Sequence, residues 1–265
     1  MSDATLVERD DGLVTVTLNR PDKRNAINDE IWNDLDRILT EVWRNPADRA
    51  LLLTGAGGTF SAGADLSGGA AGRARDDEPP RQSTLNEMRR VNEITLKLQR
   101  LPKPTIAAVD GVAVGVALGW VLACDLVVAS DRARFCAVFS KRGLTVDGGT
   151  SWSLPRLLGT RRAKQMAFFG DMVDAADAET WGMINAVVPA ADLARVAGEW
   201  ARRLASGPTT ALSLTKRMID GSDSLTFEQA LEEEARSVHI AYGTKDLIEG
   251  MTAYLERRDP HFRGV

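Results

Sequence analysis

Hydrophobic and polar residues alternate along residues 13–18, LVTVTL, and the branched side chains there favour a half-buried strand that ends at residues 19–21. Apolar residues then recur at helical spacing behind a cap at Asn28 or Asp29. These apolar residues are Ile31, Leu35, Ile38, Leu39 and Val42. A second strand follows at residues 50–55, ALLLTG. The order strand, helix, strand favours a parallel sheet.

The middle of the chain continues this order with more apolar segments. Residues 67–83 are rich in Gly, Pro and charge, which predicts a surface loop. A helix is expected at residues 85–101, a strand at residues 105–111, and a helix of small residues directly after it. Residues 125–130, DLVVAS, supply another strand. The small-residue helix is shorter than the roughly 20 residues that a membrane span requires.

Helical patterns dominate from about residue 161 onward, with a final short strand expected at Val187 and Val188. The predicted helices cover residues 190–206, 208–219, 225–242 and 246–257. We therefore expect an α/β core over residues 1–200, followed by a helical region over residues 201–265.

Composition narrows the classes of function. The 265 residues are 44% hydrophobic and 26% charged, which is ordinary for a globular protein. The formal net charge of −4 argues against general affinity for nucleic acid or for an anionic membrane. The first residues, MSDATLVERDDG, contain no basic and apolar leader, so the expected location is cytoplasmic.

Three familiar kinds of chemistry find little support. Cys124 and Cys136 have no CxxC spacing and are expected to be buried small hydrophobes rather than a disulfide. His239 and His261 have no paired ligand spacing, so no metal site is expected. The segment GTFSAG around Ser61 lacks the first glycine of a GxSxG nucleophile elbow, which disfavours a serine hydrolase.

Three segments lie at the ends of predicted strands, where α/β folds commonly bind ligands. They are residues 19–28, NRPDKRNAIN; 55–66, GAGGTFSAGADL; and 108–130, AVDGVAVGVALGWVLACDLVVAS. Together with residues 140–159 and 249–264, they resemble the crotonase superfamily, also called the enoyl-CoA hydratase/isomerase family, over nearly the whole chain. The resemblance implies an α/β crotonase-like fold, a spiral of repeated ββα units with a C-terminal helical region. It also implies a coenzyme A thioester as substrate, with no separate cofactor.

Enzymes of this family hold the thioester carbonyl oxygen with two backbone amides, which stabilise the enolate formed when a C2 proton leaves. Preorganised donors of this kind contribute about 2.7–4 kcal/mol each. By resemblance the donors are the amides of Ala64, in SAGAD, and Val116, in AVGVA. Val116 opens a helix, where free amides favour negative charge. The family usually has glycine at this position, so the branched side chain of Val116 predicts a narrowed acyl pocket.

The resemblance also implies a set of contacts with coenzyme A. Lys23 and Arg24, in the segment DKRNA with Ala26, match the family's cationic contact with the coenzyme A phosphates. The backbone of Ala62 matches the position that contacts adenine. Asp65 is expected to order the loop that contains Ala62. Without the resemblance, the two cations would be interpreted as a solvated turn.

Hydratases of the family use two glutamates, and these positions are Gly119 and Phe139 here. A two-glutamate hydration mechanism is therefore not available. One acid appears downstream, Asp147 in LTVDGGTSW. The motif resembles the branch of phenylacetate-pathway epoxyacyl-CoA isomerases and double-bond isomerases, in which an aspartate in such a turn is the base; chlorobenzoyl-CoA dehalogenase has a nucleophilic aspartate there. Burial near Phe139 and Trp152 would raise the pKa of Asp147.

Three hypotheses about activity remain open. The leading one is double-bond isomerisation of an enoyl-CoA, since one carboxylate can take a proton from one carbon and return it to another. The second is an enoyl-CoA hydratase that uses Asp147 and an ordered water. The third is a non-catalytic acyl-CoA-binding protein, in which Asp147 is a turn residue before Gly-Gly. The resemblance further implies a homotrimer or a dimer of trimers, with residues 201–265 as the trimerisation region, and a role in fatty acid metabolism.

Overall fold

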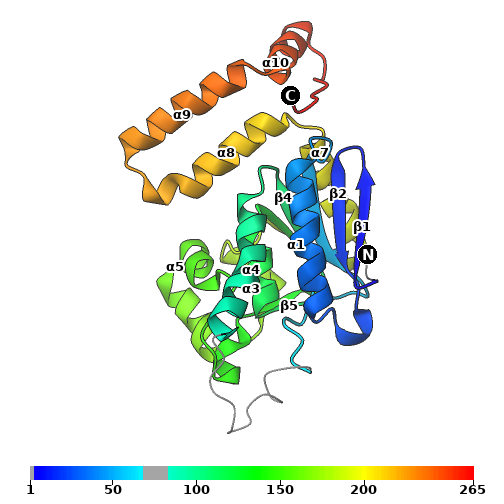
Figure 1. The fold of residues 1–265 in the computed structure, drawn as a ribbon, viewed down its shortest axis with the longest axis vertical. Helices are drawn as coiled ribbons and strands as arrows, with labels where there is room; N and C mark the ends of the chain where they lie inside the picture. The colour runs from blue at the N-terminus through cyan, green and yellow to red at the C-terminus, as the bar shows by residue number, and fades with distance from the viewer. Residues whose placement is uncertain (1–2, 68–82) are drawn as a thin grey trace.

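A six-stranded sheet forms the centre of the computed structural model, which describes residues 3–67 and 83–265 (Figure 1). Its strands, in spatial order, are β1 (Thr5–Asp10), β2 (Leu13–Leu18), β3 (Ala50–Gly55), β4 (Thr105–Val109), β6 (Leu126–Ser130) and β9 (Ala186–Val188). β1 and β2 are antiparallel, whereas the other neighbours are parallel. The five strands expected from the sequence are confirmed, and β1 is an addition.

Alternating residues of the sheet enter two separate cores. One face packs against helices α1 (Asp29–Arg44), α3 (Ser83–Arg100), α4 (Val116–Ala123) and α5 (Thr150–Phe169). The other face packs against α7 (Leu193–Ala205). In β3, for example, Leu51 and Leu53 belong to the first core, and Leu52 belongs to the second. This division follows from the two-residue period of a strand.

A second, three-stranded sheet stands beside the first. It consists of β5 (Val112–Val114), β7 (Arg134–Cys136) and β8 (Val173–Asp174), in that order. β5 was not expected, because the sequence predicted that the small-residue helix begins directly after β4. The chain instead runs β4, β5, α4 and then β6, β7, α5, which are two successive ββα units. The expected crotonase-like fold of repeated ββα units is confirmed.

A local signal in the sequence accounts for the start of α1, and the structure settles the place of three buried side chains. The side chain of Asn28 caps α1 by accepting a hydrogen bond from the Ile31 amide at 3.2 Å. Trp120 is fully buried and meets Trp32 edge to face at 5.0 Å, so it is a core residue. Cys124 and Cys136 are both buried and not bonded to each other, as expected.

The last three helices extend away from the body of the molecule (Figure 1). They are α8 (Thr209–Gly221), α9 (Phe227–Tyr242) and α10 (Lys245–Glu256). Their bounds agree with the predicted helices to within two residues. The division expected at residue 200 stays a prediction, and that residue lies inside α7. The loop predicted at residues 67–83 lies almost wholly outside the described residues. Within the described part of the chain, no helix has both the length and the apolarity for a membrane span.

Candidate active site

The loop after β3 pairs with β5 through a parallel bridge between Ser61 and Ala113, which brings two distant segments together. The Ser61 amide donates to the Val112 carbonyl at 2.8 Å, and the Val114 amide donates to the Ser61 carbonyl at 3.1 Å. Gly63 has a φ of +90°, and a Cβ there would lie 2.7 Å from the Val114 carbonyl oxygen. Glycine is therefore required for this close approach. This pairing places the segment around Ala64 beside the chain that leads into α4.

The Ala64 amide makes no hydrogen bond next to this pairing, although the amides of its neighbours do. The flanking amides donate from Ala62 to the Arg24 carbonyl (2.9 Å), from Gly63 to Ser61 Oγ (3.1 Å) and from Asp65 to the Ile27 carbonyl (2.9 Å). Within residues 3–67 and 83–265, the Ala64 amide donates no hydrogen bond to the protein. This amide is available to an acceptor from outside the chain.

The second expected donor, Val116, is the first residue of α4, as the sequence predicted. The Gly115 amide before it donates to the Cys136 carbonyl at 2.9 Å. The amides of a helix's first turn have no intrahelical partner, and in the described structure the Val116 amide finds no other acceptor. A free amide at a helix N-terminus favours a negatively charged oxygen.

The turn that contains Asp147 lies directly on α4 at Gly119. A Cβ at Gly119 would be 2.2 Å from the Gly148 carbonyl oxygen, a distance that no side chain tolerates. A Cβ at Gly148 would in turn lie 3.2 Å from Val116 Cγ2. The backbone of this turn therefore occupies the space that a side chain at position 119 would need. The absence of a glutamate at position 119 therefore follows from the position of the turn that contains Asp147.

Hydrogen bonds to the Asp147 backbone fix the turn while its carboxyl group remains free. The amide and the hydroxyl of Thr150 both donate to the Asp147 carbonyl, at 3.1 and 2.7 Å. Asp147 Oδ1 is buried and lacks a hydrogen-bond partner among the described residues. Because burial disfavours the charged form, the pKa of Asp147 rises from 3.8 to about 6. A carboxyl group with this pKa can both accept and return a proton near neutral pH.

Asp147 lines a cavity of about 630 Å³ between α3, the end of α4 and the start of α5. The lining residues include Met88, Asn92, Thr95, Leu96, Gln99, Leu122, Val146 and Trp152. Trp152 thus contributes to the surroundings of Asp147, as expected. Phe139 instead belongs to the main hydrophobic core. The α3 side of the cavity was not predicted, although Asn92, Thr95 and Gln99 recur at the spacing of one helix face.

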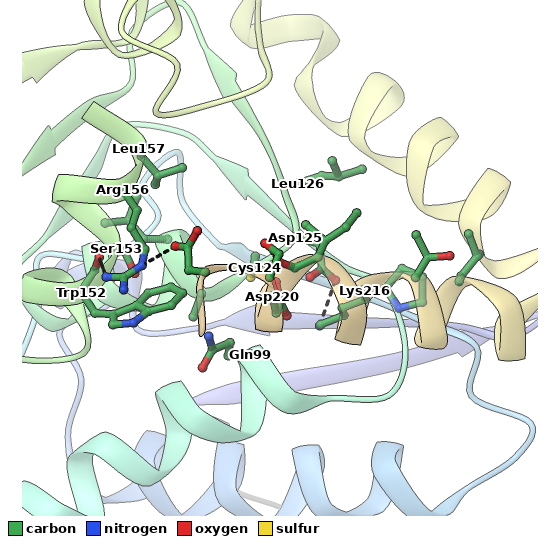
Figure 2. A pocket seen from close by; sticks show the side chains of 18 of the residues that line it. Gln99, Cys124, Asp125, Leu126, Trp152, Ser153, Arg156, Leu157, Lys216 and Asp220 are labelled. Carbon is green, nitrogen blue, oxygen red and sulfur yellow. Dashed lines mark hydrogen bonds and ion pairs between the residues drawn. The ribbon is translucent and has the colours of Figure 1, made fainter. Parts of the chain in front are cut away.

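A second cavity of about 570 Å³ adjoins the first and shares Gln99 and Trp152 with it. Figure 2 shows side chains of α3, α5 and α8 around it, and Leu122 and Ala123 at the end of α4 complete the wall. Lys216 Nζ, nearly buried, lies 3.0 Å from Asp125 Oδ2. Arg156 lies 4.0 Å from the centre of the Trp152 ring and also contacts an aspartate of the segment after α8. These contacts attach α8 to the body of the molecule.

Burial raises the pKa of Asp220, which lines the same second cavity, and the nearby charge of Asp125 adds to the effect. Burial also raises the pKa of the Cys124 thiol to about 12, so this thiol is not a nucleophile near neutral pH. The described residues contain no group of three His, Cys, Asp or Glu side chains that could hold a metal ion.

The residues expected to bind coenzyme A form a surface next to the Ala64 loop. Lys23 and Arg24 are exposed, and Arg24 has a left-handed backbone with a φ of +49°. The hydrogen bond from the Ala62 amide to the Arg24 carbonyl joins the two segments. The segment that carries the two cations therefore lies beside the loop that contains the free Ala64 amide.

The side chain of Asp65 holds the loop next to this surface through hydrogen bonds. Its carboxylate accepts a hydrogen bond from Arg20 at 2.8 Å and further hydrogen bonds from the amide and hydroxyl of Ser67. Hydrogen bonds from Ser67 and Arg20 lower the pKa of Asp65 to about 2. Arg20 also donates to the Ala26 carbonyl at 2.5 Å. The Asp65 carboxylate is therefore committed to holding the loop.

The sequence profile described as Enoyl-CoA hydratase/isomerase matches residues 8–265. The chain is 40% identical over 254 residues to a 1,2-epoxyphenylacetyl-CoA isomerase from Escherichia coli (strain K12), covering 96% of this chain and 95% of the relative. It is 34% identical to 4-chlorobenzoyl coenzyme A dehalogenase-1 from Arthrobacter sp, covering 94% of this chain and 89% of the relative. It is also similar to a solved structure of an enoyl-CoA hydratase from Bacillus anthracis, with a TM-score of 0.90, 29% identity, and coverage of 99% of this chain and 100% of that one.

Proposed function

Because the chain belongs to the enoyl-CoA hydratase/isomerase family, we propose that it isomerises the double bond of an enoyl-CoA, with Asp147 as the group that moves the proton. One observation supports this role above the others. The Asp147 turn occupies the place of a side chain at Gly119, and it presents a half-buried carboxyl group with a pKa of about 6 to a cavity. A single acid with this pKa suits proton transfer within one substrate.

In the proposed reaction, the thioester carbonyl oxygen accepts hydrogen bonds from the amides of Ala64 and Val116. The ionised Asp147 removes a proton from a carbon next to the double bond, and the electron pair of that C–H bond moves into an enolate on the carbonyl oxygen. Asp147 then returns the proton to the other end of the conjugated system, which restores the carbonyl and shifts the double bond. The two amides stabilise the enolate more than the ground state.

The proposed coenzyme A site consists of Lys23 and Arg24 for the phosphates, with Ala26, Ala62 and Asp65 shaping the surface beside them. The hydrogen bond that joins Ala62 to Arg24 supports this grouping. Replacing both cations by alanine would raise KM and leave kcat close to that of the wild type, because these contacts are equal in the ground and transition states. A fall in kcat by the same factor as the rise in KM would contradict the assignment.

A homotrimer, or a dimer of trimers, is proposed for the assembly. The projecting helices α8 to α10 expose large apolar side chains in the described chain, which supports burial against other subunits. These include Ile219, Phe227, Tyr242, Ile248, Tyr254 and Leu255. Light scattering that gives the mass of one chain at working concentration would reject the assembly. The cytoplasmic location and the role in fatty acid metabolism stay predictions.

The test of the reaction is proton exchange at C2 and C4 of 3-hexenoyl-CoA in deuterated water, followed by NMR. Wild type should incorporate deuterium and shift the double bond, whereas Asp147→Asn should bind the substrate and do neither. Exchange that persists unchanged in Asp147→Asn would reject Asp147 as the base. Addition of water to crotonyl-CoA by the wild type, without double-bond migration in 3-hexenoyl-CoA, would favour the hydratase instead.

A further inference from the structure

The cavity at Asp147 contains a second polar group without a partner, the hydroxyl of Thr95. Thr95 Oγ1 and Asp147 Oδ1 are both closed to solvent, and neither has a hydrogen-bond partner among the described residues. Both residues line the same cavity, Thr95 from α3 and Asp147 from the turn before α5. A buried polar atom without a partner costs free energy, so two of them in one cavity wall require an explanation.

The contact of Thr95 with Gly149 indicates where its hydroxyl can point. A Cβ at Gly149 would lie 3.2 Å from Thr95 Cγ2, so the methyl group faces the turn that contains Asp147. Threonine in a helix divides its χ1 angle between two rotamers. A rotation by roughly 120° about this one bond moves Oγ1 to the staggered position that the methyl group now occupies, at the wall of the cavity, and moves the methyl group to the third position. The hydroxyl is available for this change, because it makes no bond to the helix carbonyls behind it.

The remaining cavity wall determines which ligand suits this pair. Several neighbours are apolar side chains, namely Met88, Leu96, Leu122, Val146 and Trp152. A hydrocarbon acyl group would satisfy these neighbours, but it would exclude water and leave the Thr95 hydroxyl unpartnered. An acyl group that bears an oxygen atom would accept a hydrogen bond from that hydroxyl. Sites with such a donor discriminate strongly against analogues that lack the acceptor.

We propose that Thr95 determines substrate specificity by donating a hydrogen bond to an oxygen atom on the acyl group, so that the substrate is an oxygen-bearing acyl-CoA. This inference rests on the proposed function, since it concerns the same cavity and the same Asp147. The shared chemistry is an oxygen acceptor. The acceptor oxygen could belong to a bound water instead of the acyl group, and the experiment below distinguishes these two cases.

The experiment measures dissociation constants by calorimetry for two matched pairs of ligands. The pairs are phenylacetyl-CoA with 2-hydroxyphenylacetyl-CoA, and hexanoyl-CoA with 3-hydroxyhexanoyl-CoA. Wild type should bind the hydroxylated member of at least one pair about tenfold more tightly. Thr95→Val, which keeps the shape and removes the hydroxyl, should abolish that preference. Thr95→Ser, which keeps the hydroxyl, should retain most of it.

Thermal unfolding of the same proteins provides the control. Because the hydroxyl has no partner in the fold, Thr95→Val should be at least as stable as wild type. A clear loss of stability would mean that the hydroxyl bonds within the protein, which would overturn the proposal. A wild type without preference in either pair would overturn it, as would an equal weakening of both members in Thr95→Val, because that result assigns the acceptor to water.

Failure of the proposed function would be visible separately. Deuterium exchange at C2 of 3-hexenoyl-CoA is measured on the same wild-type preparation. The same exchange is measured with 2-hydroxyphenylacetyl-CoA, which bears the oxygen atom. Absence of exchange with both thioesters would reject the isomerase, whereas the ligand preferences would still decide the role of Thr95.

Discussion

Replacing Asp147 by asparagine should abolish turnover and at the same time stabilise the fold at neutral pH. The carboxyl group has a pKa of about 6 in the folded chain, compared with 3.8 for an unperturbed aspartate, and desolvation is the cause. The folded state therefore holds a proton between these pH values that the unfolded state releases. Stability falls as the pH rises through this window, and the loss is complete above pH 6. Asparagine has a similar shape and no charge, so it removes the loss.

The size of the effect follows from the shift. One pKa unit corresponds to about 1.4 kcal/mol, so a rise from 3.8 to about 6 gives about 3 kcal/mol as a ceiling. The carboxyl group is partly accessible to solvent, which screens its charge, and we expect a gain of about 1–2 kcal/mol at about pH 7.5. At about pH 3.5 the wild-type carboxyl is mostly protonated in both states, and the gain should fall to about 0.2 kcal/mol.

The measurement is the free energy of unfolding by urea for wild type and Asp147→Asn, at about pH 7.5 and about pH 3.5, alongside the exchange assay. A stabilised but inactive variant is typical of a group that is held in an unfavourable environment for catalysis. A variant that is less stable at the higher pH would refute the reasoning, because it would show that the carboxylate bonds within the fold. A gain of equal size at both pH values would show that the charge is not its source.

Three further predictions concern the same arrangement. The kcat/KM of the wild type should rise tenfold per pH unit below about pH 6 and level off above it, because Asp147 must be ionised to accept a proton; a profile that is flat from about pH 5 to 8 would contradict this. Gly119→Ala should lower stability by about 1–3 kcal/mol and displace the Asp147 turn, since its Cβ meets a carbonyl oxygen at 2.2 Å, whereas Gly221→Ala, with open space around it, should leave kcat unchanged. Lys216→Met should cost about 1 kcal/mol in urea unfolding because a largely buried ammonium group is lost from the partly exposed Asp125, whereas Lys141→Met in an exposed ion pair should cost less than about 0.5 kcal/mol; equal costs would disprove the role of burial.

The sequence predicts the main sheet well because its strands repeat a local pattern. Residues 13–18 and 50–55 bury alternate or continuous apolar side chains, and each pattern is complete within its own segment. β5 has three residues, and its VAV sequence continues into the apolar α4, so no local signal separates the two. β1 is mostly exposed, which removes the hydrophobic alternation that would reveal it.

The candidate site could be predicted only as far as single positions. The resemblance predicts Ala64, Val116 and Asp147 as site residues, and the structure shows free amides at the first two and a free carboxyl group at the third. The contact between Gly119 and Gly148 joins residues that are far apart along the chain, so no spacing could reveal it. Thr95 was missed for a related reason, since one hydroxyl on a helix face has no signal until its neighbours are known.

The close packing at Gly119 also constrains how this site could be redesigned. A glutamate introduced at position 119 alone would collide with the Gly148 carbonyl oxygen, which would lie only 2.2 Å from the new Cβ. Shortening or rebuilding the turn alone would remove the acid and leave an empty groove on α4. The two changes are therefore strongly epistatic, and a route that moves the catalytic acid from residue 147 to residue 119 has to pass through an inactive intermediate unless both are made together. For an engineer, the backbone of this turn is the first design variable, and the identity of residue 119 is the second.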